Sequence, residues 1–256
     1  MAKTATIAFL TVTAFSVGAR AEDFRVETTV KVGKQQYMFL TLFRGTKAYD
    51  FQLPKSEISI FDMRSKQVIL VDPKRSLRTI VTFADLEKFS IALRMRAKER
   101  KEDGFFGDIK YQFNKDARLP HQAATNVLAY AARSVTPPDP EDASRYRKFT
   151  DAAARLAAFK PGGLPPFVRL QLNEEIEKIG QVPVEVRRTI HRLNLAKNGR
   201  DEVTATHDYN WLLAENDQTR IAQANKWLAQ FKTVTLEVYL QIAPRVANAP
   251  GKPPLK

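Results

Sequence analysis

Two histidines in this chain are spaced so that they could bind a metal ion together. His191 and His207 lie on either side of Asn198-Gly199, a dipeptide typical of a tight β-hairpin turn. If the hairpin loop spans residues 198–200, the two histidines lie directly opposite each other, with side chains about 5 Å apart, close enough to share a metal ion. If the loop is Asn198-Gly199 alone, the pairing shifts by one residue and the imidazoles point to opposite faces.

Apolar matching around this hairpin favours the first register, in which Val203 pairs with Leu195. Further ligands are missing, because Asp208 alternates to the other face and His121 is remote in the sequence. A structural zinc needs four protein ligands, and a catalytic zinc needs three plus a water molecule. We therefore expect two partly buried structural histidines, no bound metal and no other cofactor. A metal-dependent hydrolase that uses the histidine pair is kept as an alternative.

The other catalytic patterns are weaker. The chain has no cysteine, which excludes a nucleophilic thiol and cysteine metal ligands. It has no Gly-x-Ser-x-Gly turn for a nucleophilic serine and no glycine-rich phosphate loop. Asp50, Asp62 and Asp72 lie near predicted strand ends, and the last two are ordinary turn residues rather than a catalytic carboxylate pair. The sequence therefore favours a protein that is not an enzyme.

The first 21 residues have the three parts of a signal peptide. Lys3 supplies a positive start, residues 5–17 are apolar apart from Thr and Ser, and Ala19-Arg20-Ala21 is a small-x-small cleavage site. No cysteine follows that site, which excludes a lipid-anchored mature protein, and no second apolar run is long enough to cross a membrane. We therefore expect a periplasmic or secreted protein, and the lack of disulfides suits a bacterial periplasm.

The chain is strongly basic. Its formal net charge is +13, and removal of the predicted signal peptide, which contains Lys3 and Arg20, lowers the charge to +11. Such a surface can attract anionic lipid head groups, cell-wall polymers or nucleic acid. Because export is expected, nucleic acid is not expected as a partner. Taken alone, the net charge favours a solvated basic surface without any partner over a docking surface.

A meander of antiparallel strands is the element around which the rest of the chain is expected to be organised. Between Phe24 and Val32, mainly apolar residues on one face alternate with charged and polar residues on the other. This is the pattern of a strand with one buried face. Turn residues then recur every 8 to 12 residues, as an antiparallel sheet or partial barrel requires. The predicted strands span residues 24–32, 36–43, 48–53, 57–62, 67–71 and 77–81.

Helical periodicity and capping residues predict the remaining elements. Thr82-x-x-Asp85 resembles a capping box, and Asp139-Pro140-Glu141-Asp142 is a strong helix start. Residues 126–133 and 234–242 each fit either a strand or a short helix. Helices are otherwise expected at 82–101, 139–159, 165–179 and 217–231, and strands at 109–113, 184–195 and 203–213.

We expect residues 22–243 to form a single domain. Thr136-Pro137-Pro138 interrupts the chain, and it marks a candidate break between two subregions near 134–139. Residues 244–256 contain Pro250-Gly251-Lys252-Pro253-Pro254 and are expected to form a disordered tail.

The strand at 36–43 is apolar on both of its faces. Positions 38, 40 and 42 are aliphatic or methionine, and positions 37, 39 and 43 are aromatic. Such a strand either packs on two sides or lines a cavity that holds a ligand. In the second case the candidate ligand-binding residues are Met38, Leu40, Leu42, Tyr49 and Phe51.

Two parts of the chain resemble known families. Residues 41–51 (TLFRGTKAYDF), 58–62 (ISIFD) and 68–72 (VILVD) resemble the strand succession of periplasmic lipoprotein-carrier (LolA/LolB-like) domains. Residues 164–173 (LPPFVRLQLN) resemble an uncharacterised family of exported bacterial proteins. The carrier resemblance implies an open half-barrel with helices over its mouth that binds acyl chains. It carries no functional residue over to this sequence.

The predicted fold class is α+β, a curved antiparallel sheet (an open half-barrel) with helices packed over its concave face. The leading hypothesis is a non-enzymatic periplasmic binding or carrier-type protein for an apolar or amphiphilic ligand, such as a lipid or a lipoprotein acyl chain. The alternative is a basic interaction module that docks on an anionic envelope surface or on a partner protein. The sequence leaves the ligand and the oligomeric state open.

Overall fold

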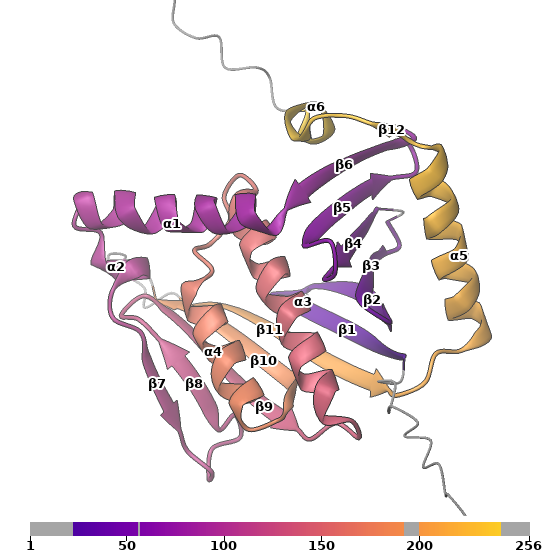
Figure 1. The fold of residues 1–256 in the computed structure, drawn as a ribbon. Helices are drawn as coiled ribbons and strands as arrows, with labels where there is room; N and C mark the ends of the chain where they lie inside the picture. The colour runs from indigo at the N-terminus through magenta and orange to yellow at the C-terminus, as the bar shows by residue number, and fades with distance from the viewer. Residues whose placement is uncertain (1–22, 56, 192–199, 242–256) are drawn as a thin grey trace, which may run out of the picture.

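The structure, a computed structural model, describes residues 23–55, 57–191 and 200–241 (Figure 1). The predicted signal peptide, the Asn198-Gly199 turn and the predicted tail at 244–256 lie outside the described residues.

One large sheet organises the described part of the chain. Its twelve strands follow the order β12-β6-β5-β4-β3-β2-β1-β11-β10-β9-β8-β7, and every neighbouring pair is antiparallel except β12 with β6. The strands are β1 (Phe24–Val32), β2 (Gln35–Arg44), β3 (Lys47–Leu53), β4 (Ile58–Asp62), β5 (Gln67–Asp72), β6 (Leu77–Thr82), β7 (Lys110–Phe113), β8 (His121–Ala124), β9 (Leu128–Val135), β10 (Val182–His191), β11 (Arg200–Asn210) and β12 (Lys232–Thr233). The helices are α1 (Phe83–Glu99), α2 (Asp103–Phe106), α3 (Pro140–Phe159), α4 (Phe167–Lys178), α5 (Glu215–Gln230) and α6 (Leu236–Leu240).

The predicted α+β class and the antiparallel meander are confirmed. Strands β1 to β6 follow one another along the chain and pair in that order. The four predicted long helices correspond to α1, α3, α4 and α5. Of the two ambiguous segments, 126–133 overlaps strand β9, which continues to Val135, and 234–242 contains helix α6. The sequence patterns do not predict α2, β8 or β12, which are only two to four residues long.

The predicted helix starts are confirmed by their caps. Thr82 accepts a hydrogen bond from the backbone N–H of Asp85 (3.1 Å) at the start of α1. Asp139 accepts one from the backbone N–H of Glu141 (2.8 Å) at the start of α3, where Pro140 occupies the first helical position. Each cap satisfies a backbone donor that the helix itself leaves free.

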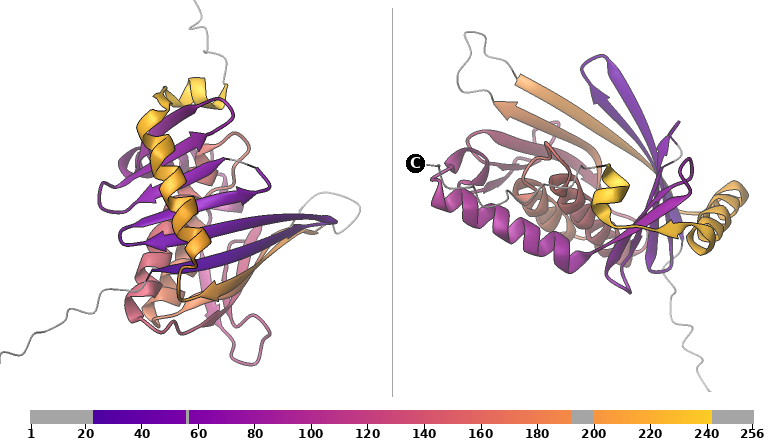
Figure 2. Two further views of the ribbon diagram at one scale, coloured as in Figure 1. Left: turned by 90° about the vertical axis from the view of Figure 1, so that its right-hand side faces the viewer. Right: turned by 90° about the horizontal axis from the view of Figure 1, so that it is seen from above.

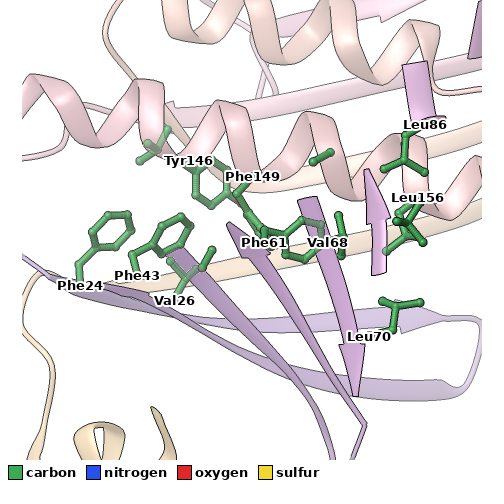
Figure 3. Packing of buried hydrophobic residues seen from close by; sticks show 14 of the residues in the cluster. Phe24, Val26, Phe43, Phe61, Val68, Leu70, Leu86, Tyr146, Phe149 and Leu156 are labelled. Carbon is green, nitrogen blue, oxygen red and sulfur yellow. The ribbon is translucent and has the colours of Figure 1, made fainter. Parts of the chain in front are cut away.

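The largest buried cluster lies between helix α3 and one face of strands β1 to β6, which we call the α3 face (Figure 3). The Phe149 ring packs edge-on against Phe43 (5.5 Å between ring centroids) and Phe61 (4.9 Å). Phe24 stacks on Phe43 at 4.2 Å. These contacts explain why one face of the first strands is apolar, because each buried aromatic ring removes a large apolar area from water.

Helix α5 covers the opposite face of the same strands, which we call the α5 face (Figure 2). Its buried residues Ile221 and Ala224 pack on β2 to β5. The sequence predicts helices over one face of the sheet, and the structure has helices on both faces. Both faces of β2 are covered over residues 40–43, so the two-sided apolar pattern there follows from packing, whereas Tyr37 and Met38 remain exposed.

The second half of the sheet has a smaller core of its own. Helix α4 packs on β8, β9 and β10 through Val168, Leu172 and Ile176. The sheet runs without interruption from β1 through β11 to these strands, so the Pro-rich segment at 136–138 connects β9 to α3 rather than two separate sheets. Among the described residues, no helix combines the length and apolar character needed to span a bilayer.

Candidate functional site

The predicted ligand-binding residues lie mainly on the α5 face. The set consists of Met38, Leu40, Leu42, Tyr49 and Phe51. Four of them are buried in one cluster with Ile221 and Ala224 of α5. The Tyr49 hydroxyl donates a hydrogen bond to Oδ1 of Asn225 (3.1 Å), and Met38 is 46% exposed at the start of β2. The space above these four side chains is therefore occupied by α5.

The predicted cross-strand pairing of His191 with His207 is wrong, and neither of the two predicted hairpin registers is the observed one. Strand β10 pairs His191 with Arg200. On β11, His207 instead pairs with Thr28 of β1. The two histidines are seven residue positions apart along the hairpin, roughly 20 Å at the rise of a β-strand. The register is set by long stretches of cross-strand packing, such as Val186 with Ala205, and these outweigh the local turn signal.

The imidazole of the half-buried His207 is a neutral hydrogen-bonding group. Its Nδ1 lies 2.9 Å from the Thr28 hydroxyl, and its buried Nε2 has no hydrogen-bond partner among the described residues. Burial lowers the pKa of His207 to about 3, and the positive charge of Arg169 on α4 acts in the same direction. His207 therefore stays uncharged at neutral pH.

His121 also has a structural environment. Its Nδ1 lies 2.9 Å from the Tyr111 hydroxyl and its Nε2 lies 2.9 Å from the Ser134 hydroxyl. Burial lowers the pKa of this imidazole. Within the part of the chain that the structure describes, no group of three or more His, Asp and Glu side chains could hold a metal ion.

The turn interpretation of two aspartates is confirmed. Asp62 accepts hydrogen bonds from the backbone N–H groups of Arg64 and Ser65 (both 3.1 Å), and Asp72 accepts one from that of Lys74 (2.9 Å). Asp50 differs from both, because it points to the α3 face and accepts a hydrogen bond from the Thr41 hydroxyl (2.8 Å). Burial raises the pKa of Asp50 to about 6 although Thr41 and Lys160 act in the opposite direction.

The α3 face carries an apolar surface that the described helices leave partly open. We call this surface the open apolar patch, and its members are neighbours across β11, β1 and β2. Val30 pairs with Ala205 on one side and with Tyr37 on the other, and Val32 pairs with Val203. Val32 is 40% exposed and Tyr37 is 37% exposed, while the others are half-buried. The open apolar patch consists of Val30, Val32, Tyr37, Phe39, Val203 and Ala205.

Two arginines border this patch on the side of α4. Arg188 is the cross-strand neighbour of Val203, and its Nε is buried without a hydrogen-bond partner among the described residues. Arg169 lies over the ring of Tyr130, with 5.9 Å from its guanidinium carbon to the ring centroid. Tyr130 in turn pairs with Arg188. The patch therefore combines an apolar sheet surface with two neighbouring cations.

Tyr146 belongs to the main buried cluster, and the partly buried Tyr209 packs against it. Tyr146 of α3 contacts His207 (6.1 Å between ring centroids) and Tyr209 (5.7 Å). Burial raises the pKa of both tyrosines, and Arg169 opposes that shift. The Tyr209 hydroxyl donates a hydrogen bond to the backbone carbonyl of Pro183 (2.7 Å), which ties β11 to β10.

Sequence reasoning identifies only part of this site. Tyr37 and Phe39 are recognised as the second apolar face of their strand, and Val30 and Val32 as the buried face of the first strand. Arg169 and Arg188 give no local signal, because they lie on different elements and meet only in the folded chain. No family model matches the chain, and no curated protein matches its sequence.

Proposed function

We propose that the protein is a non-enzymatic, exported binding or carrier protein for an anionic amphiphile with an acyl chain. The observation that carries this proposal is the open apolar patch with Arg169 and Arg188 at its border. The ligand-binding residues predicted from the sequence lie mainly on the α5 face, and α5 covers much of that face. The proposed binding surface therefore lies on the other side of the sheet, the α3 face.

The apolar part of the ligand would lie on the patch. Exposed contiguous apolar surfaces on a folded protein commonly mark binding sites. Each methylene group that leaves water contributes about 0.8 kcal/mol, so a long acyl chain gains substantially from even partial coverage. Three paired strands supply this surface, and this favours an extended ligand that lies along the sheet over a compact one.

The anionic part of the ligand would lie at the arginines. The guanidinium of Arg188 has a donor with no partner among the described residues, and Arg169 adds a second positive charge nearby. Guanidinium groups bind carboxylates and phosphates through parallel hydrogen bonds, and such bonds are strong in a partly buried environment.

The proposal includes a curved sheet in which the patch lines the concave side, as in the lipoprotein carriers that the N-terminal part resembles. In the view from above, the ends of β1 with β2 and of β10 with β11 extend past α3 and α4 (Figure 2, right). This arrangement supports the proposal, because it leaves the outer ends of these strands accessible from the helix side.

The first experiment is native mass spectrometry and lipid extraction of protein purified from its own host, with an acyl-chain ligand as the expected result. The second measures binding of palmitic acid by displacement of a fluorescent fatty acid. Val32→Asp should weaken binding about tenfold by removing one to two methylene contacts and adding a negative charge. Ile91→Asp on α1, at a residue that is 54% exposed outside the patch, is the matched control and should leave binding unchanged.

The role of the arginines has its own test. Arg188→Gln should weaken binding of palmitic acid but not of hexadecanol, which has the same chain length and no charge. Equal binding of palmitic acid by the wild type and all three variants would refute the proposed site. A protein free of ligand in both experiments would refute the carrier function itself.

Salt dependence separates this function from the alternative of a basic docking module. Binding dominated by an acyl chain should change little between low and high salt, whereas docking of a +11 surface on an anionic surface should weaken steeply.

A further inference from the structure

A second candidate site lies at the opposite ends of the strands that carry the open apolar patch. A pocket of about 640 Å³ lies where the β2–β3 turn (Thr46) and the β4–β5 turn (Met63 to Lys66) meet α1 and α3. A neighbouring pocket of about 350 Å³ shares Thr46, Met63, Arg64 and Lys148 with it. Arg44, at the end of β2 two residues before Thr46, is seven residues beyond Tyr37, roughly 20 Å at the rise of a β-strand, so this pocket is separate from the patch.

Positive charge dominates the lining of the larger pocket. Arg64 and Lys66 come from the β4–β5 turn, and Lys148 and Arg155 come from α3. The last two are seven residues apart and therefore lie on one face of the helix. Among the described residues, no carboxylate lies within ion-pair distance of any of these four cations.

The acids of the pocket do not cancel this charge. Glu87 and Asp151 are the two that line it. Asp151 already pairs with Arg147 (3.5 Å) and accepts a hydrogen bond from the side-chain amide of Asn173 (2.8 Å). The pocket therefore retains a net positive charge with cations from two different elements.

The turn that carries two of the cations is held in place. Asp62 accepts hydrogen bonds from the backbone of Arg64 and Ser65, and the Nζ of Lys47 lies 3.6 Å from the Asp62 carboxylate. The backbone N–H of Phe83 donates to the carbonyl of Lys66 (2.9 Å), which ties the turn to the start of α1. A site that is ordered before binding loses less entropy when the ligand arrives.

The base of the pocket is apolar. Met63, Phe83, Leu86 and Ala152 line it, and Leu86 and Ala152 are buried, whereas Arg64, Lys66 and Lys148 are exposed. The volume is within the range of small-molecule sites, and an apolar base with a few charged groups above it is the usual composition of such sites.

We infer that this pocket binds a phosphate-bearing ligand, with the phosphate between the cations of the β4–β5 turn and those of α3 and the uncharged part of the ligand on the apolar base. Four cations without ion-pair partners match a group with more than one negative charge better than a single carboxylate. A phosphate ester in solution and the head group of a phospholipid share this chemistry.

Isothermal titration calorimetry with inorganic pyrophosphate at low salt tests the soluble source. One site per chain is expected for the wild type. The double variant Arg64→Gln/Arg155→Gln should weaken binding about tenfold or more, since each guanidinium contributes a charge-assisted hydrogen bond. The charge-matched control is Arg220→Gln/Lys226→Gln on the exposed side of α5, which should bind pyrophosphate within about twofold of the wild type.

Vesicle co-sedimentation tests the lipid source. Vesicles of phosphatidylcholine that contain phosphatidic acid are compared with vesicles of phosphatidylcholine alone. Binding of the phosphatidic acid vesicles that depends on Arg64 and Arg155 assigns the site to a lipid head group; pyrophosphate binding without vesicle binding assigns it to a soluble phosphate ester.

Two results would overturn the inference. In the first, neither pyrophosphate nor the phosphatidic acid vesicles bind in a way that Arg64→Gln/Arg155→Gln weakens. The other is equal weakening by the two double variants, which would show that net charge alone attracts the anion. If Arg64→Gln/Arg155→Gln is less stable in urea than the wild type, Lys66→Gln/Lys148→Gln provides a second pair of exposed cations for the same comparison. Palmitic acid binding by these variants should be unchanged, so the proposed phosphate site and the proposed acyl-chain site are tested independently.

Discussion

Asp50 provides the sharpest physical test of the structure, because its burial predicts how stability depends on pH. The carboxyl group lies on the α3 face and accepts one hydrogen bond from the Thr41 hydroxyl (2.8 Å). Burial raises its pKa from 3.8 to about 6. Replacement by asparagine removes the charge, keeps the shape and retains an oxygen that can accept the Thr41 hydrogen bond.

The sign follows from proton linkage. At low pH the carboxyl group is protonated in both states. As pH rises above 3.8, the unfolded state releases the proton first, and the free energy of unfolding falls until the folded state also ionises near pH 6. Above that pH the loss is constant, and it amounts to at most about 3 kcal/mol for a pKa raised by this amount.

Asp50→Asn should therefore have nearly the stability of the wild type at about pH 4 and exceed it by up to about 3 kcal/mol at about pH 7.5. Urea denaturation at four or five pH values measures the difference between variant and wild type, so that all other titrating groups cancel. Asp116→Asn, in an exposed loop, is the control for loss of one negative charge. A difference between Asp50→Asn and wild type that does not change with pH would refute the assignment of a buried, destabilised carboxylate.

Three further predictions concern stability, and all are measured by urea denaturation. Phe149→Ala should cost about 3–5 kcal/mol because its ring packs on Phe43 and Phe61 in the main core, and a loss below about 1 kcal/mol would contradict that packing. Tyr49→Phe should cost about 1 kcal/mol by removing the hydrogen bond to Asn225 of α5, and it should have no effect if α5 does not dock as described. His207 has a pKa lowered to about 3, so the wild type should lose stability as pH falls from about 6.5 toward 3; His207→Asn should reduce this loss, and an unchanged acid loss would show that the imidazole is not buried.

Some of the structure could be predicted from the sequence because its causes are local. Alternation with a period of two places the side chains of β1 to β6 on two faces, and turn residues between them end each strand. Thr82 and Asp139 mark helix starts because a side-chain oxygen at that position satisfies a free backbone donor. These signals depend on residues a few positions apart, and they gave the correct elements.

Tertiary structure decided how these elements meet. The pairing of Thr28 with His207 joins residues 179 positions apart, and β10 pairs His191 with Arg200, a register that neither predicted hairpin loop produces. The apolar pattern of β2 is compatible with a cavity or with packing on two sides, and only the docking of α5 on one face distinguishes the two there. The convergence of Arg169 with Arg188, and of Arg64 with Arg155, depends on helices packed against a sheet. The spacing of residues along the chain does not predict these contacts, because they depend on how the whole fold buries its apolar surface.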